Sequence, residues 1–268
     1  MKASKSLSLI IVITLSIKTS LFAWTSSNEG VCYSLDSLAL LSDSIYYNDT
    51  SKVYVSFCHI NILANDTLKI NEGEILMFLM DLQPGNYIFY GINIYGTLLA
   101  YGTKSNPITI GDPESTLTSG EIWGGIKFFN TSQNGESKLS YCRLLKPKEF
   151  QLLIESAIYC YNSSPIIDHC TFSYLSSGEE TGGCSAISCT GESYPIISFC
   201  EFNNILNGVA IWCNPFGSQD TVNYPSPLLV GCNILNTVSG FNGYGCDYDI
   251  VILNGGFLDN CYLGATYY

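Results

Sequence analysis

The sequence predicts an all-β protein, a right-handed parallel β-helix whose coils each hold roughly 24–35 residues. The first observation is a phrase that returns: SAIYCYNSSPIIDHCTFSYL at 156–175 is followed by SAISCTGESYPIISFCEFNNI at 185–205. The second is the composition, with 24 glycines and 13% aromatic residues, which suits short strands and turns. A phrase that returns at a regular period describes a structural unit that stacks on its neighbours.

Two short patterns recur along the chain in the same order. One has an aliphatic residue three positions before a cysteine and an aliphatic residue or phenylalanine two positions after it. Its cysteines are spaced by 28, 30, 32 and 29 residues: Cys142, Cys170, Cys200, Cys232 and Cys261. The other pattern is a small residue, isoleucine, a variable residue, and then cysteine or phenylalanine. It begins at Gly125, Ala157, Ala186 and Ala210.

Each repeated unit therefore holds two or three short strands separated by turns. Alternate residues of a strand face one side, so the apolar residues point inward and the variable residues point outward. The length varies in the polar linkers, of which 214–227 is the longest. This loose period favours the right-handed type over the left-handed type, which follows a hexapeptide rhythm. A β-sandwich is the alternative fold, but it does not predict an equivalent cysteine in every unit.

Several stretches resemble a known fold group. INIYGTLLAYGTKSNPITI at 92–110, WGGIKF at 123–128 and the coils ending in HCTF and FCEF resemble the secreted right-handed parallel β-helix proteins of bacteria, in the pectate-lyase-like fold group. The stretches 31–45 and 65–76 resemble the lead-in of that group. The resemblance implies the fold over nearly the whole chain after residue 23. It implies no single activity, because this fold carries lyases, hydrolases, adhesins and proteins without known activity.

The first 23 residues have the features of a secretory signal peptide. Lys2 and Lys5 precede an apolar run over 7–17, and the segment ends at Ala23. We therefore expect a signal peptide over 1–23, an N-terminal lead-in or cap over 24–52, and the β-helix over 53–268. An uncleaved membrane anchor is the alternative, although the apolar run is short for a membrane span.

The chain is acidic, with a formal net charge of −12. Removal of residues 1–23 takes away three lysines and no acidic residue, which makes the charge −15. Such a surface repels nucleic acid and anionic membranes, so we expect no nucleic-acid partner and no membrane insertion after signal cleavage. It also disfavours polyanionic substrates, unless a calcium ion or a local basic patch intervenes.

The twelve cysteines fall mostly on repeated positions. One predicted ladder holds the five cysteines of the first pattern, and a second holds Cys160, Cys189 and Cys213. Stacked coils place equivalent residues about 4.8 Å apart, where cysteine acts as a small apolar filler. We expect mostly free, buried thiols there, although the spacing also permits bridges. Four cysteines lie outside the ladders, and any disulfide is expected among them rather than in the ladders: Cys32, Cys58, Cys184 and Cys246.

No residue is assigned a catalytic role. Asp168 and His169 are neighbours, but alternation along a strand sends adjacent side chains to opposite sides, so we expect a structural histidine at a turn and no catalytic dyad. Asp247 and Asp249 share one face of a strand and are the candidate ligands of a calcium ion, the one cofactor left open. The sequence offers no convincing pair of facing carboxylates of the kind that an inverting glycosidase needs.

The outward residues between isoleucine and cysteine form the candidate binding face, to which the longest linker adds further side chains. Aromatic rings beside carboxylates and amides suit sugars, which offer apolar ring faces and hydroxyl edges. The outward column holds Lys127, Tyr159, Ser188 and Trp212. The candidate ligand-binding residues are Tyr159, Trp212, Phe216, Asp220 and Tyr224. In the alternative interpretation, the linker packs its aromatic side chains against the coil wall.

The sequence thus favours a secreted, non-catalytic β-helix protein of the cell surface or extracellular space, with the periplasm as an alternative location. Its expected partner is a polysaccharide or a cell-surface glycan. A polysaccharide-degrading enzyme, either a lyase or a glycoside hydrolase, is the first alternative. A structural or adhesive rod without a discrete site is the second, and in that case an uncapped end would allow end-to-end self-association.

Overall fold

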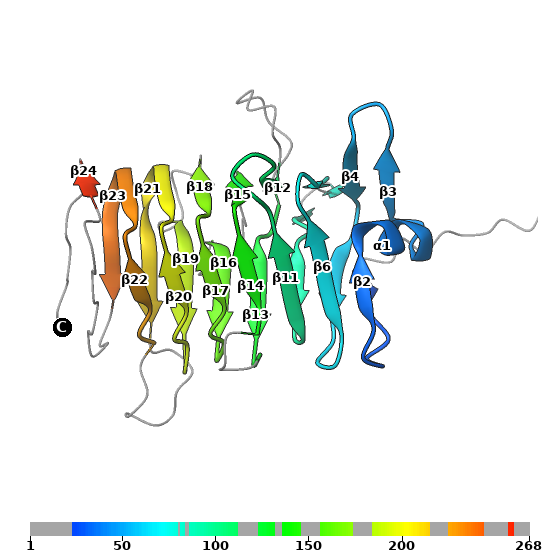
Figure 1. Cartoon of the computed structure of the whole chain (residues 1–268), viewed down its shortest axis with the longest axis horizontal. Coiled ribbons are helices and arrows are strands. Elements are labelled where there is room, and N and C mark those ends of the chain that lie inside the picture. Colours follow the sequence, from blue (N-terminus) through cyan, green and yellow to red (C-terminus); the bar gives the residue numbers. More distant parts are fainter. Residues whose placement is uncertain are drawn as a thin grey trace, which may run out of the picture.

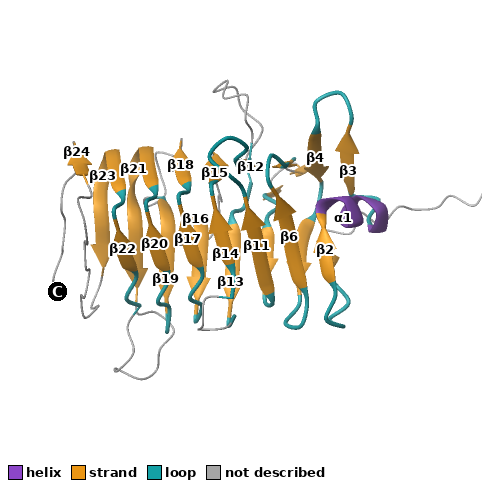
Figure 2. Cartoon of the chain, in the orientation of Figure 1, coloured by secondary structure: helices purple, strands orange, loops and turns teal. Residues whose placement is uncertain are grey.

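The computed structural model confirms the predicted right-handed parallel β-helix. It describes residues 23–79, 81–83, 86–111, 123–131, 136–145, 156–173, 184–214, 225–243 and 257–259. The coils stack in sequence order along the long axis of the molecule (Figure 1). Strands dominate, and the one helix of the described residues lies at the N-terminal end (Figure 2). Parallel pairing between coils excludes the β-sandwich.

Each full coil contributes one strand to each of three columns. In the first column the strands pair in parallel and in register, so that the isoleucines at 60, 92, 126, 158, 187 and 211 lie in one inward line. All six are fully buried. The strands are β1 (Ala23–Thr25), β5 (His59–Ile62), β10 (Ile92–Ile94), β13 (Ile126–Phe129), β16 (Ser156–Tyr161), β19 (Ser185–Thr190) and the second halves of β21 (Glu201–Asn214) and β23 (Asn233–Gly243).

The second column is a seven-stranded parallel sheet. One inward line of this sheet runs from Ile70 through Ala100, Leu139, Ile167 and Ile197 to Leu229. Its strands are β2 (Cys32–Ser34), β6 (Thr67–Asn71), β11 (Thr97–Tyr101), β14 (Lys138–Ser140), β17 (Ile166–Asp168), β20 (Ile196–Ser198) and β22 (Leu228–Val230). The outward residues of this column lead directly into the turn that carries the candidate site.

The third column begins after that turn. It contains β4 (Val53–Ser56), β7 (Ile75–Phe78), β12 (Ile108–Ile110), β15 (Cys142–Leu145), β18 (Thr171–Ser173), the first half of β21, β23 (Asn233–Gly243) and β24 (Phe257–Asp259). Phe172 and Phe202 stack in its core with ring centroids 4.9 Å apart. Because β21 and β23 continue from the third column into the first, these two columns form one sheet.

The N-terminal end of the solenoid is capped. Helix α1 (Leu35–Leu41) starts at Ser34, whose side chain forms a capping box with Ser37, and it buries Leu35 and Leu38. Strand β3 (Ile45–Asn48) adds antiparallel to β4, and β8 (Asp81–Gln83) and β9 (Asn86–Ile88) form a small hairpin. Strands β1 and β2 pair with β5 and β6, so the segment 24–52 supplies strands of the first coil as well as the cap.

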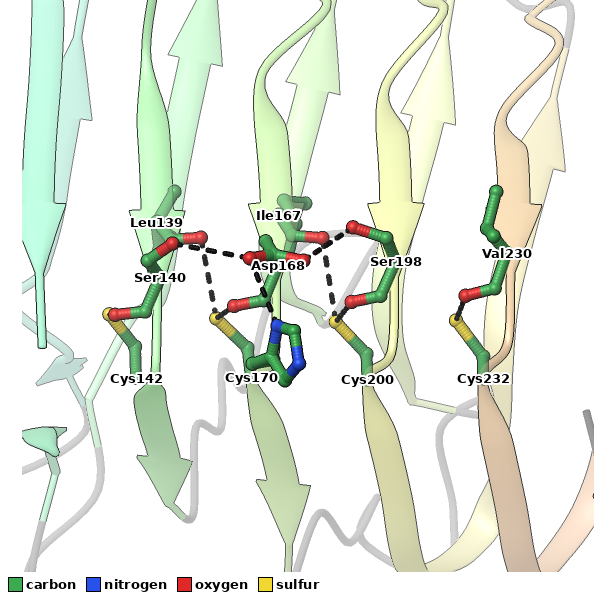
Figure 3. A network of polar contacts seen from close by, with 11 residues as sticks. Leu139, Ser140, Cys142, Ile167, Asp168, Cys170, Ser198, Cys200, Val230 and Cys232 are labelled. Carbon is green, nitrogen blue, oxygen red and sulfur yellow. Dashed lines mark hydrogen bonds and ion pairs between the residues drawn. The ribbon is translucent and has the colours of Figure 1, made fainter. Parts of the chain in front are cut away.

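The structure places the predicted cysteine ladders on two inward lines. Cys160, Cys189 and Cys213 are direct register partners in the first column. The cysteines at 142, 170, 200 and 232 lie in line where the third column begins (Figure 3). All ten described cysteines have free thiols, and all of them except Cys32 are buried. Cys246 and Cys261 lie outside the described residues.

We predict that a short pulse of a small alkylating reagent labels Cys32 in the native protein and spares the other nine described cysteines. These nine thiols are buried and out of reach of the reagent, and burial also raises the pKa of the Cys160 and Cys200 thiols. Hydrogen bonds between neighbouring cysteines lower the pKa of Cys170, Cys189 and Cys232, so these three are protected by burial alone. Peptide mass mapping of native protein, with a denatured sample as the control, measures the labelling. Rapid labelling of Cys170 or Cys200 in the native sample would contradict this ladder.

Candidate functional site

The turn between the second and third columns has the same backbone conformation in four successive coils. Tyr141, His169, Phe199 and Gly231 have φ angles of 50, 52, 51 and 60°. Such left-handed values are uncommon for residues other than glycine. Three of these residues donate a backbone hydrogen bond to the next coil: Tyr141 to Asp168 O at 3.0 Å, His169 to Ser198 O at 2.9 Å and Phe199 to Val230 O at 2.8 Å. The turns are therefore stacked in register.

The cysteine that follows each turn contacts backbone carbonyls. Cys170 Sγ lies 3.4 Å from the carbonyl oxygen of Asp168 and 3.7 Å from that of Leu139 in the preceding coil. Cys200 repeats the arrangement with Ser198 at 3.3 Å and Ile167 at 3.5 Å (Figure 3). The thiols thus serve as weak donors to the corner carbonyls as well as fillers of the core. Counting cysteine spacings gives no sign of this second role.

The side chains of the turn residues form an aromatic stack on the outside of the corner. The ring centroids of Tyr141 and His169 are 4.6 Å apart with an interplanar angle of 20°. His169 and Phe199 follow at 5.1 Å and 30°. His169 and Phe199 are exposed, and Tyr141 is half-buried. The stack therefore continues over three coils, one ring per coil.

A carboxylate lies beside this stack. Ser140, Asp168 and Ser198 are register partners at the end of the second column. Ser198 Oγ donates a hydrogen bond of 2.6 Å to Asp168 Oδ1, and Ser140 Oγ lies 3.5 Å from Oδ2 on the other side (Figure 3). Partial burial would raise the pKa of Asp168, but the hydrogen bonds from Ser198 and His169 outweigh it and lower that pKa below its ordinary value. Asp168 is therefore ionised at neutral pH.

The expectation that Asp168 and His169 point to opposite sides was wrong. His169 Nδ1 lies 3.0 Å from Asp168 Oδ2. The reason is the left-handed φ of His169, which breaks the alternation of an extended strand. Ser198 donates to the carboxylate and not to the imidazole, so these groups do not form the hydroxyl–imidazole–carboxylate chain of a serine hydrolase.

These observations define the corner site, which consists of Ser140, Tyr141, Asp168, His169, Ser198 and Phe199. It combines stacked rings, the Ser198 hydroxyl and an ionised carboxylate on the outer surface of three coils, whereas Ser140 is buried. Sequence reasoning assigned none of these residues to the binding face. The available signal was the slot directly before each cysteine, which holds tyrosine, histidine and phenylalanine in successive coils.

The predicted binding face lies on the first column, in the expected register. Lys127, Tyr159, Ser188 and Trp212 are successive partners on β13, β16, β19 and β21. However, Ser188 is completely buried, and Tyr159 and Trp212 are half-buried. The Tyr159 hydroxyl is hydrogen-bonded to Thr190 Oγ1 at 2.8 Å. Two of the four side chains of this column, Tyr159 and Ser188, are therefore hydrogen-bonded within the protein or buried.

The same face continues toward the N-terminal end as an amide ladder. Asn93 Nδ2 donates to Asn61 Oδ1 at 2.8 Å, and Asn61 Nδ2 donates to Thr25 Oγ1 at 3.2 Å. Beside it, Tyr95 stacks on Phe129 with centroids 5.3 Å apart. These side chains bond mainly to one another from coil to coil.

The other predicted site residues lie outside the described residues: Phe216, Asp220, Tyr224, Asp247 and Asp249. Within the described part of the chain, no group of three or more histidine, cysteine, aspartate or glutamate side chains is arranged to hold a metal ion. None of the helices described there has the length and apolar character that crossing a membrane requires.

Comparisons with models of protein families, with curated proteins and with solved structures give no match to this chain. The case for its function therefore rests on the fold and on the corner site.

We predict that His169→Ala lowers the free energy of unfolding by about 1–2 kcal/mol, because it removes two ring contacts. His169→Phe keeps the ring stack and loses only the contact to Asp168. Phenylalanine also fits the turn, because Phe199 already has a positive φ at the equivalent position. Its effect should stay below about 1 kcal/mol, as for other partly exposed ion pairs. Urea titrations of the two variants give the comparison. Equal losses would mean that the Asp168 contact, and not stacking, stabilises the corner.

Proposed function

We propose that this chain is a secreted, non-catalytic β-helix protein of the extracellular space or cell surface that binds carbohydrate through the corner site. The single observation that carries the proposal is the exposed aromatic stack beside the hydrogen-bonded carboxylate of Asp168. Carbohydrate recognition needs this combination, because a sugar ring offers an apolar face to an aromatic ring and hydroxyl groups to polar side chains.

The chemistry of Asp168 does not suit the general-acid role in glycoside hydrolysis. The general acid of a glycosidase needs a raised pKa, so that it is protonated near neutral pH. Hydrogen bonds from Ser198 and His169 act in the opposite direction on Asp168 and lower its pKa. The carboxylate is thus suited to accept hydrogen bonds from ligand hydroxyl or ammonium groups, and not to donate a proton to a leaving group.

The charge of the chain supports a neutral or cationic glycan as the ligand. The net charge of −12 disfavours the approach of polyuronates. A ligand that carries hydroxyl or amino groups meets no such barrier. Extended glycans also suit the shape of the site, since one side chain per coil is presented along a straight line.

We predict that the purified protein is retained on an insoluble neutral or amino polysaccharide, such as cellulose, chitin or chitosan, and releases no reducing ends from it with or without calcium. Asp168→Asn should weaken retention about tenfold, which corresponds to about 1.4 kcal/mol. Glu136→Gln, at an exposed position outside the site, is the matched control and should bind like the wild type. Pull-down at graded polysaccharide concentrations and a reducing-end assay measure the two properties.

The outcomes of this experiment separate the alternatives. Release of reducing ends would overturn the non-catalytic assignment in favour of a lyase or hydrolase. Neither retention nor release would overturn carbohydrate binding and leave a structural rod. If Trp212→Ala abolishes retention and Asp168→Asn does not, the ligand lies on the first column and not on the corner site.

Secretion is the second part of the proposal, and residues 1–23 support it through their lysine, apolar and small-residue order. We predict that expression of the full chain in a secreting bacterial host yields a protein outside the cytoplasm whose first residue is Trp24. Amino-terminal sequencing of the exported product measures the cleavage site. Recovery of the protein in the membrane fraction with residues 1–23 attached would identify an anchor instead.

A further inference from the structure

The aromatic stack of the corner site ends at a glycine on each side. Gly102 donates its backbone N–H to Ser140 O at 2.9 Å, which repeats the turn-to-next-coil bond that Tyr141, His169 and Phe199 make. Gly231 follows Phe199 in the same slot of the next coil, with a φ of 60°. The register therefore continues over five successive coils, four of which have the left-handed turn residue, and only the middle three place a ring there.

The outer face of the Phe199 ring is the open end of this stack. The inner ring faces are covered, because each ring packs on its neighbour at 4.6 or 5.1 Å. The relative solvent exposure of Phe199 is 51%. Beyond it, Gly231 has the backbone of a ring-bearing turn residue and no side chain. The position next to the Phe199 ring, above Gly231, is thus bordered by the Phe199 ring on one side and holds no ring from the turn residue of its own coil.

The opposite end is built differently. A Cβ atom at Gly102 would lie 2.5 Å from the carbonyl oxygen of Tyr141, so the backbone itself excludes a side chain there. Tyr141 is also half-buried, whereas Phe199 is exposed. A ligand ring therefore has better access at the Phe199 end.

We propose that a sugar ring of the bound glycan occupies the slot over Gly231 and stacks on the outer face of Phe199 as the fourth ring of the ladder. This inference rests on the carbohydrate-binding function proposed above and names its central subsite. The ligand class is a neutral or amino sugar. Ser198 directly precedes Phe199, and its hydroxyl is held 2.6 Å from the ionised carboxylate of Asp168. Asp168 lies two coils from Gly231, on the other side of Ser198, so its charge is about 10 Å from the slot along the stack. At that distance the charge acts through space, which favours an ammonium group in the slot and disfavours a uronate.

Two variants test the slot in different ways. Gly231→His fills the slot with a ring without removing any group of the site, and positive φ at this turn position is already tolerated by His169. Phe199→Asn removes the ring, and asparagine adopts left-handed φ more readily than most residues. Tyr194→Asn is the control, because Tyr194 is an exposed aromatic residue of the same coil that lies outside the slot.

Isothermal titration calorimetry with cellohexaose, a chitosan hexamer and a galacturonate hexamer gives the readout. We expect the wild type and Tyr194→Asn to bind the neutral or the amino oligosaccharide with equal affinity, and both slot variants to bind it at least tenfold more weakly. Circular dichroism and protection of the buried thiols verify that the variants are folded.

Other results would overturn the inference in distinct ways. If the wild type binds and both slot variants bind equally well, the slot is wrong while carbohydrate binding stands. Tightest binding of the galacturonate hexamer would overturn the ligand class. If the wild type binds none of the three oligosaccharides and no polysaccharide, the inference falls together with the proposed function.

Discussion

The left-handed turn residue before each corner cysteine is the constraint on which the corner of this solenoid depends. A positive φ at this one position turns the chain from the second column into the third and ends the strict alternation of the strand. Three features follow from it. The carbonyl oxygens before the turn lie within hydrogen-bond distance of the cysteine thiols, and the side chains of the turn residues point outward and stack. The imidazole of His169 contacts the carboxylate of Asp168. Non-glycine residues tolerate this conformation here because stacking and inter-coil hydrogen bonds hold it in three successive coils.

Stacking converts a one-dimensional repeat into columns, and each side chain is then in contact with its equivalents above and below. An inward column of isoleucine, leucine and phenylalanine satisfies this rule by burial alone. A carboxylate does not, because two aspartates in adjacent coils would repel each other at about 4.8 Å. Asp168 is instead placed between Ser140 and Ser198, whose hydroxyl groups lie on either side of it. The polar column thus holds one carboxylate between two neutral hydroxyl groups, and this carboxylate stays ionised at the surface.

The function proposed for the chain depends on the position at which the aromatic stack of the corner site ends. Along the first column, side-chain amides hydrogen-bond to one another, aromatic rings stack on one another, and Ser188 is buried. At the corner the ladder of rings stops at Phe199, beside an ionised carboxylate, while the backbone continues in the same form through Gly231. The stacked side chains that end at Phe199 are already arranged to contact one more ring, and we propose that a ring of the ligand takes this position.

Much of the fold was predictable, because the periodicity of apolar residues and cysteines can be recognised in short stretches of the sequence. Isoleucine before a variable residue and cysteine identified the first column, and the spacing of Cys142, Cys170, Cys200 and Cys232 identified the start of the third. The parallel β-helix follows from these because one coil cannot bury its apolar face without the next. The candidate binding residues Tyr159 and Trp212 were placed in the correct register for the same reason.

The corner site itself was decided by tertiary structure. Local sequence shows tyrosine, histidine and phenylalanine before three cysteines, but it does not show that their φ angles are positive or that their rings meet across coils. The contact of His169 with Asp168 contradicted the strand alternation for this reason. Burial was likewise not readable, since Ser188 occupies the same position of the pattern as the half-buried Lys127, Tyr159 and Trp212 and yet is completely buried. Sequence determined which residues face inward, because that depends on a period of two along the chain. Only the structure decided which outward residues come together, because that depends on the turn angle and on neighbours about thirty residues away.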